Sequence, residues 1–85
     1  MSDAVLVTGA FGLVGTATVR HLATLGRHVV ATDVATPVTR KAAAEVPAGV
    51  KTHWADLTDP GQVAALLSEV EPAAIIHLAA VIPPL

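Results

Sequence analysis

The stretch VLVTGAFGLVGTATVRHL, from Val5 to Leu22, decides how this chain folds. An apolar run comes first, three glycines follow at a spacing of three (Gly9, Gly12 and Gly15), and a helix-like stretch comes last. The apolar run predicts a buried strand, and the last stretch predicts a helix. The glycines therefore lie in the turn between strand and helix and in the first turn of that helix.

Each glycine has a separate physical use in such a turn. Gly9 permits a tight turn that a side chain would hinder. Gly12 lets backbone N–H groups approach a pyrophosphate at the helix N-terminus, where the helix dipole favours negative charge. Gly15 falls on the buried face of the helix and lets it pack closely on the strand. The pattern predicts a dinucleotide-binding loop, with a glycine-rich turn that binds nothing as the alternative.

The composition favours one small domain with a buried core. The chain has 85 residues, of which 53% are apolar and 14% are charged. The net charge is −2 and the Lys and Arg residues are scattered, which argues against a nucleic-acid partner. No cysteine is present, the N-terminus lacks the basic region of a signal peptide, and the uncharged run 72–85 is too short and proline-rich to span a membrane. We expect a cytoplasmic protein.

Further apolar runs predict the other strands. Residues 4–8, 28–32 and 73–80 are apolar throughout, as in strands buried on both faces of a parallel sheet, whereas the more polar run 50–55 predicts an edge strand. Helices are expected at 13–25, around 39–46 with Pro47 as its stop, and from Asp59 to 70. The order β-α-β-α-β-α-β predicts parallel strands with right-handed crossovers. Together with the dinucleotide-binding loop, it predicts a partial Rossmann-type doubly wound parallel sheet with strand order 3-2-1-4.

Side-chain periodicity predicts which faces of the helices are buried. In the first helix, Gly15 shares a face with Thr18, Val19, Leu22 and Leu25. For the last helix, Asp59 is the expected N-cap, and Gln62 has the spacing of a capping box. The expected buried positions of that helix are Val63, Leu66, Leu67 and Val70.

An acidic residue follows the second predicted strand. Asp33 lies about 20 residues beyond the glycines, where a dinucleotide-binding unit places the acid that holds the adenosine ribose. An ordinary turn acid after a strand is the alternative.

Three motifs in order resemble one family. TGAFGLVG (8–15) matches the TGxxGxxG of the extended short-chain dehydrogenase/reductases, a group that includes NAD-dependent epimerases and dehydratases acting on nucleotide sugars. ADLTD (55–59) resembles the acidic pair of that family after the third strand, and IIHLAA (75–80) resembles its fourth-strand signature.

The resemblance implies a cofactor and the residues that bind it. The loop backbone from Phe11 to Val14 would face the pyrophosphate, and Asp33 would accept hydrogen bonds from the ribose. Asp56 would accept one from the adenine amino group. Because an acid in the place of Asp33 repels a 2′-phosphate and Val34 follows it, NAD is favoured over NADP. The complete expected set is Gly9, Phe11, Gly12, Leu13, Val14, Gly15, Asp33, Asp56, Leu57 (on the adenine ring), Leu78, Ala79 and Ala80 (at the end of strand four).

Other polar residues have simpler interpretations. Asp56 could cap the turn into the last helix, although Asp59 already fits that role. His77 is expected to be a packed, hydrogen-bonded core residue rather than a catalyst, and Trp54 to pack on the edge strand. The remaining histidines lack metal-ligand spacing, so no metal site is expected.

The chain departs from the family in one respect that matters for catalysis. The family uses a Tyr-x-x-x-Lys pair for proton transfer, and this sequence contains no tyrosine. We therefore expect no catalytic residue here, and we interpret residues 1–85 as the N-terminal part of an NAD(P)-binding domain whose catalytic and substrate-binding half is absent. A non-catalytic NAD(P)-binding or sensing module and an inactive truncated remnant are the alternatives. We expect the complete protein to be a homodimer, and the open edge of the fourth strand to favour self-association.

Overall fold

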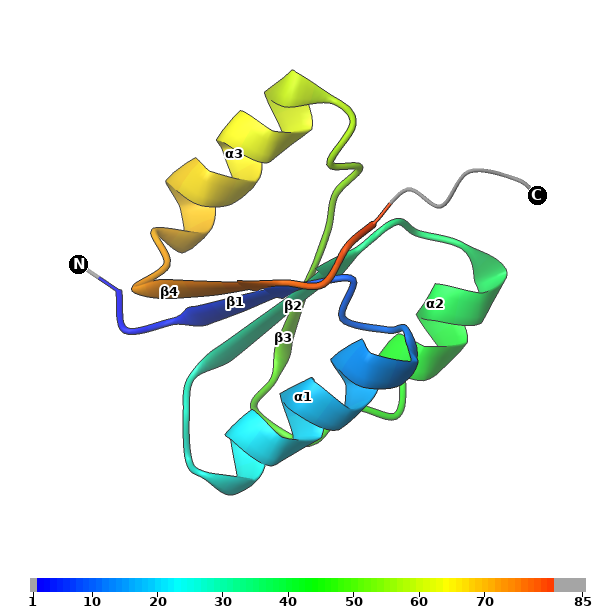
Figure 1. Cartoon of the computed structure of the whole chain (residues 1–85), viewed down its shortest axis with the longest axis vertical. Coiled ribbons are helices and arrows are strands. Elements are labelled where there is room, and N and C mark those ends of the chain that lie inside the picture. The colour runs from blue at the N-terminus through cyan, green and yellow to red at the C-terminus, as the bar shows by residue number, and fades with distance from the viewer. Residues whose placement is uncertain (1, 81–85) are drawn as a thin grey trace.

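A computed structural model describes residues 2–80 and shows a four-stranded parallel sheet with helices on both faces (Figure 1). The strand order is β3-β2-β1-β4, so the predicted doubly wound fold and its strand order are confirmed. The elements are β1 (Val5–Thr8), α1 (Leu13–Thr24), β2 (Val29–Asp33), α2 (Pro37–Ala43), β3 (Lys51–Trp54), α3 (Pro60–Val70) and β4 (Ala74–His77).

Alternating side chains of the central strands build two separate core layers. Helices α1 and α2 cover one face of the sheet, and α3 covers the other (Figure 1). Val5 and Val7 of β1 belong to the cluster that contains Val19 of α1. Leu6, which points the opposite way because side chains alternate along a strand, packs in the cluster that contains Leu66 of α3.

The fourth strand differs from the buried strand that the sequence predicts. It spans only Ala74–His77 instead of 73–80, and Ile75 is 51% exposed. The strand pairs with β1 on one side and lies at the edge of the sheet on the other. Ile76 is half-buried and packs against the core cluster under α1, whereas Ile75 is exposed. The apolar composition of β4 therefore brings only partial burial within residues 2–80, where the strand has a neighbour on one side alone.

The short helix α2 begins and ends a few residues earlier than predicted. It runs over Pro37–Ala43 instead of 39–46, so it ends before Pro47 is reached. Its start is determined by Thr36, whose hydroxyl accepts from the Thr39 N–H while the Thr39 hydroxyl accepts from the Thr36 N–H. This reciprocal cap uses threonine in the place of the usual Glu or Gln, and Pro37 suits the first helical position.

Two leucines that the periodicity placed in the core are exposed. Leu25 is 61% exposed because α1 ends at Thr24 and Leu25 is its C-cap. Leu67 of α3 is 40% exposed, and Leu66 is the one fully buried residue of that helix. The N-cap of α3 is Asp59 as predicted, since its carboxylate accepts from the N–H groups of Gly61 and Gln62.

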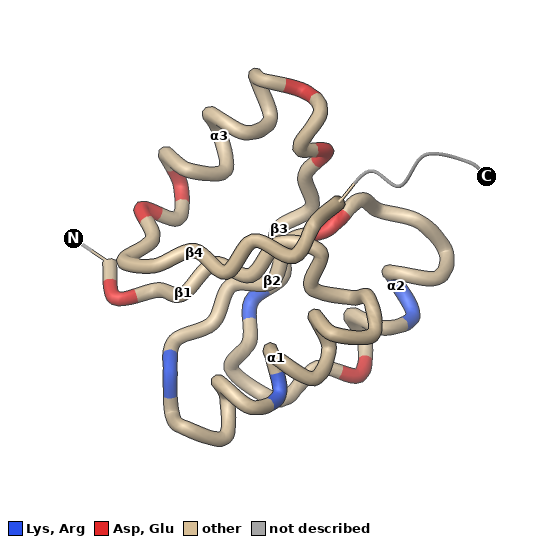
Figure 2. The backbone as a smooth tube through the Cα atoms, in the orientation of Figure 1, with Lys and Arg blue, Asp and Glu red and all other residues tan. Residues whose placement is uncertain are grey.

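Charges are divided between the two faces of the sheet. Lys51 is the last Lys or Arg of the sequence, so α3 and the loops around it carry acidic residues without basic ones, whereas the arginines lie on α1, on α2 and in the loop after α1 (Figure 2). His53 Nε2 lies 2.7 Å from the carboxylate of Glu69 and links β3 to α3. Within residues 2–80, every helix falls short of the length and apolar character required to cross a bilayer.

Two glycines allow three backbone segments to meet beyond the end of β1. Gly9 has a φ of +62°, and a Cβ there would lie 2.8 Å from the Ala79 nitrogen, just beyond β4. A Cβ at Gly15 would overlap the Gly9 carbonyl oxygen and lie 2.7 Å from the Ala10 carbonyl carbon. Helix α1 thus packs directly on the turn after β1, whereas the sequence pattern predicts that Gly15 packs closely on the strand itself.

Gly15→Ala should destabilise the fold by about 3 kcal/mol, because the added methyl group meets rigid backbone. The control is Ala17→Ser, on the exposed side of the same helix, which should change the free energy of unfolding by no more than about 0.5 kcal/mol. Urea unfolding followed by circular dichroism measures both. Equal stability of the two variants would contradict the close packing.

Candidate dinucleotide site

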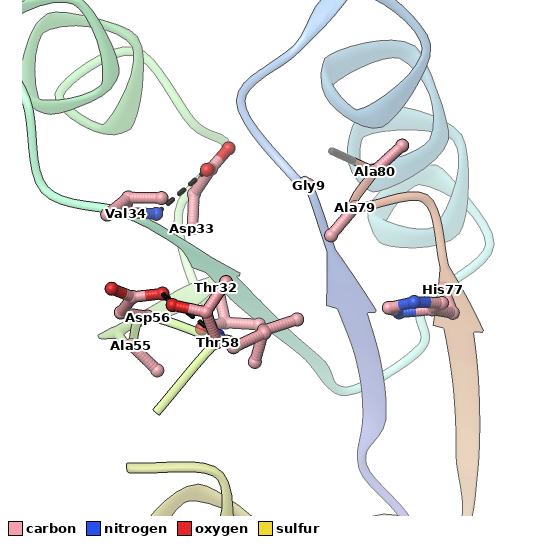
Figure 3. A pocket seen from close by; sticks show the side chains of 11 residues that line it. Gly9, Thr32, Asp33, Val34, Ala55, Asp56, Thr58, His77, Ala79 and Ala80 are labelled. Carbon is pink, nitrogen blue, oxygen red and sulfur yellow. Dashed lines mark hydrogen bonds between the residues drawn. The ribbon is translucent and has the colours of Figure 1, made fainter. Parts of the chain in front are cut away.

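A cavity of about 340 Å³ lies at the carboxyl ends of the strands, where open parallel sheets bind their ligands. In Figure 3, Asp33 and Asp56 lie on one side of this cavity, and His77 and Ala79 lie on the other. Its volume lies within the range of small-molecule sites. The lining residues are Gly9, Thr32, Asp33, Val34, Ala55, Asp56, Leu57, Thr58, His77, Ala79 and Ala80.

Asp33 joins the end of β2 to the glycine-rich loop. One carboxylate oxygen accepts from the Phe11 N–H at 3.1 Å, and the other accepts from the Val34 N–H at 2.8 Å (Figure 3 draws the second bond). Each oxygen has a second lone pair, so the carboxylate can also accept hydroxyl groups of a ligand. Asp33 therefore has a structural role that the sequence pattern does not reveal.

Asp56 is held by its own turn. Its Oδ1 accepts from both the hydroxyl and the backbone N–H of Thr58, at 2.7 and 2.9 Å, and these bonds hold the pKa of Asp56 below its usual value. The cap of α3 is Asp59 alone; the Gln62 side chain accepts from the Asp56 N–H instead of completing a capping box with Asp59. Asp56 thus remains a charged acceptor in the wall of the cavity.

The first turn of α1 offers unpaired N–H groups beside this cavity. The Phe11 N–H is already bonded to Asp33, and the Gly12 N–H donates to the Gly9 carbonyl, so neither is an unpaired donor. The N–H groups of Leu13, Val14 and Gly15 have no partner among residues 2–80. Three free donors at a helix N-terminus form a ready site for an anion.

A threonine hydroxyl holds the segment after β4 in place. Thr8 Oγ1 accepts from the N–H groups of Leu78 and Ala79, at 3.0 and 3.2 Å, and lies 2.7 Å from Nδ1 of His77. The Leu78 N–H also donates to the Thr8 backbone carbonyl, at 3.2 Å. Thr8 therefore ties His77 and the two residues after it to the end of β1.

The structure corrects the expected positions of two residues in this segment. His77 is hydrogen-bonded as predicted, but it is exposed and lines the cavity instead of packing in the core. The Leu78 side chain packs against the core under α1, so it does not line the cavity, whereas Ala79 and Ala80 do. The cause is the short β4: the chain leaves the sheet after His77 and turns over Gly9.

The cavity contains five residues that sequence reasoning missed. These are Thr32, Val34, Ala55, Thr58 and His77. Each lies at the end of a strand or soon after it, next to a predicted position, which is the signal that could have found them. Thr32 is fully buried, and its Oγ1 has no hydrogen-bond partner within residues 2–80. Trp54 lies outside the cavity and contacts Phe11, with ring centroids 5.5 Å apart.

The fold and the glycine-rich loop agree with a comparison of the sequence with known protein families. The profile of the NAD-dependent epimerase/dehydratase family matches residues 5–84. The chain belongs to this family. A search of curated proteins gave no match.

Solved structures of members of this family and related reductases share the fold. A short-chain dehydrogenase/reductase family protein has a TM-score of 0.84 and 29% identity, over 95% of this chain and 35% of its own. The UDP-glucose 4-epimerase of Thermus thermophilus, in complex with NAD, has a TM-score of 0.79 and 33% identity, over 92% and 24%. A UDP-glucose 4-epimerase from Stenotrophomonas maltophila with bound NAD has 0.74 and 28%, over 95% and 25%. The chain thus spans about a quarter to a third of these proteins.

Thr8→Val should destabilise the protein by about 2 kcal/mol, because it keeps the shape but leaves the Ala79 N–H without its acceptor. Thr8→Ser retains the hydroxyl and is the control, with an expected loss below about 1 kcal/mol. Hydrogen exchange of the Ala79 amide should accelerate in the valine variant alone. Unchanged exchange in Thr8→Val would show that the hydroxyl does not hold this segment.

Proposed function

We propose that this chain is the NAD-binding portion of an NAD-dependent epimerase/dehydratase-type oxidoreductase. In the complete protein, hydride would pass between a nicotinamide ring and a hydroxyl or carbonyl substrate, with a nucleotide sugar as the substrate class that we favour. Two of the related proteins described above are UDP-glucose 4-epimerases with NAD bound, which supports both parts of the proposal. Residues beyond these 85 would supply the proton transfer and the selection of substrate.

The proposal rests on two neighbouring subsites of opposite character, one made of N–H donors and one that contains carboxylates. The free N–H groups of Leu13, Val14 and Gly15 suit the pyrophosphate, since they are donors at the positive end of a helix. The cavity beside them contains the carboxylates of Asp33 and Asp56, which suit the hydroxyl and amino donors of adenosine. One molecule that carries an anionic centre and a neutral, donor-rich end satisfies both.

Gly12 provides a further argument for a ligand at the loop. A Cβ there would meet only the Gly9 carbonyl oxygen, at the ordinary contact distance of 3.6 Å. Its φ of −79° is open to any residue. The fold itself therefore does not require glycine at this position, in contrast to Gly9 and Gly15. The close approach of a pyrophosphate does require it.

Gly12→Ala should leave the free energy of unfolding within about 0.5 kcal/mol and weaken NAD binding by about tenfold, which corresponds to about 1.4 kcal/mol. Gly61→Ala, in the first turn of α3, is the matched control and should bind NAD as the unmutated chain does. Isothermal titration calorimetry with NAD measures both. A glycine-rich turn that binds nothing would give no NAD signal in any of the three proteins.

The unmutated chain should bind NAD about tenfold to a few hundredfold more tightly than NADP. The reason is repulsion between the Asp33 carboxylate and a 2′-phosphate, which at about 4 Å costs about 1 kcal/mol in water and about 4 kcal/mol near a protein surface. Asp33→Ser should remove most of this preference and also weaken NAD binding, because it loses the bond to the Phe11 N–H. Dissociation constants for both nucleotides test this, and tighter NADP binding by the unmutated chain would contradict it.

Self-association through the β4 edge is the partner interaction that we propose for the chain alone. An open, apolar edge strand presents unpaired backbone groups to a second copy. Ile75→Lys should reduce association, since a charged side chain on an edge strand opposes pairing. Val38→Lys, at a 76% exposed position of α2, is the control. Sedimentation velocity at tens of micromolar measures the outcome, and a monomer in the unmutated chain would contradict the proposal.

A further inference from the structure

An arginine is stacked on the ring that lies next to Asp33. Trp54 ends β3 and is the strand partner of Asp33, the last residue of β2. The guanidinium carbon of Arg40, in α2, lies 5.5 Å from the centroid of the Trp54 ring. The Phe11 ring also contacts Trp54, tilted by 48°, and the Phe11 N–H donates to the Asp33 carboxylate. Arg40 is thus linked, through one indole, to the loop and to the proposed ribose acceptor.

The identity of this arginine matters for a phosphorylated ribose. Arg40 is the first basic residue after Asp33 in the sequence, and part of its side chain is open to solvent. A guanidinium group binds phosphate through two parallel hydrogen bonds and keeps its charge at any physiological pH. Released from the indole, Arg40 would be the first cation after Asp33 that could meet a 2′-phosphate there, and it would offset the repulsion by that carboxylate.

We propose that Trp54 is a specificity-determining residue that holds Arg40 on its ring and so keeps it from a 2′-phosphate. The inference rests on the proposed function, because it concerns the choice between NAD and NADP at the same site. Trp54 does not line the cavity, so it acts through Arg40 and not by contact with the nucleotide. Preference for NAD then has two sources: repulsion by Asp33 and the retention of Arg40.

The size of the second effect follows from the strength of the stack. A cation–π contact at an exposed site favours the stacked state by about two- to fivefold. The phosphate must compete with this contact, so its apparent affinity is reduced by about the same factor. Removal of the indole should therefore lower the ratio of the NADP to the NAD dissociation constant by about threefold.

The experiment is a double-mutant cycle with Trp54→Leu and Arg40→Gln in the full 85-residue chain. Dissociation constants for NAD and for NADP are measured for each single variant and for the double variant. We expect Trp54→Leu to lower the ratio of the NADP to the NAD dissociation constant by about threefold. In the Arg40→Gln background, adding Trp54→Leu should leave this ratio unchanged. Trp54→Phe keeps an aromatic face for Arg40 and for Phe11, so it should change the ratio by less than about twofold.

Two results would overturn this inference without affecting the proposed function. Equal weakening of both nucleotides by Trp54→Leu would mean that the indole only supports the loop through Phe11. If Trp54→Leu lowered the ratio of the two dissociation constants equally in the unmutated and the Arg40→Gln backgrounds, a group other than Arg40 would bind the phosphate. If the unmutated chain binds neither nucleotide, the proposed function fails and the inference falls with it, a result distinct from NAD binding with an unchanged ratio.

A measurement on the unmutated chain avoids any folding defect of Trp54→Leu. Since Trp54 is the one tryptophan in the sequence, ring-current shifts of the Arg40 side-chain protons report the stack, and Arg40→Gln identifies those signals by NMR. Saturating NAD should leave the shifts in place, and saturating NADP should move them toward the values of an unstacked arginine. Arg40 signals that remain shifted in the NADP complex would overturn the inference.

Discussion

The backbone at Gly9 is packed on two sides, and the geometry of the site depends on this contact. On one side the segment after β4 approaches so closely that a Cβ would lie 2.8 Å from the Ala79 nitrogen. On the other side α1 crosses the turn at Gly15, where a Cβ would lie 2.7 Å from the Ala10 carbonyl carbon. The turn at Gly9 and the end of β4 at His77 therefore border the same cavity, although they are more than 60 residues apart in the chain.

Hydrogen bonds then fix the segments that the close packing brings together. The Thr8 hydroxyl is bonded to His77 and to the two residues after it, and Asp33 is bonded to the N–H of Phe11. Both groups lie at strand ends, where the sheet no longer supplies partners to the backbone. A carboxylate that is fixed before the ligand arrives requires little further ordering when it binds. Asp33 thus combines a structural bond with the position proposed for ribose recognition.

The distribution of charge divides the site into two parts. Asp33 and Asp56 place negative charge in the cavity, and the α3 side of the sheet carries no Lys or Arg within residues 52–80 (Figure 2). The unpaired N–H groups of α1 supply the positive end without any charged side chain. An anion is therefore favoured at the N-terminus of α1 and disfavoured in the cavity. A bound dinucleotide would accordingly place its pyrophosphate at the helix and its adenosine in the cavity. Arg40 is the first cation after Asp33 in the sequence, and its guanidinium carbon lies 5.5 Å from the centroid of the Trp54 ring.

Local sequence patterns were sufficient for the order of elements and for the loop at Gly9, because these depend on glycine, on apolar runs and on caps such as Asp59. The strand order was predicted from the dinucleotide-binding pattern and not from the alternation of strands and helices alone, since other doubly wound sheets share that alternation. Tertiary contacts decided the rest. Asp33 and Asp56 were predicted as ligand residues, but their bonds to Phe11 and Thr58 depend on loop geometry that periodicity does not encode. Burial was the property that sequence predicted least well: Ile75 is apolar but exposed, because burial requires a neighbouring layer and not only an apolar side chain.

The surroundings of charged side chains could not be predicted from the sequence either. The position of Arg40 in the chain does not reveal that its guanidinium group lies over the Trp54 ring. The sequence by itself determined the fold and the position of the loop, since both follow from backbone preferences over a few residues. Only the tertiary structure decided which side chains meet, because those contacts join residues that are far apart in the chain.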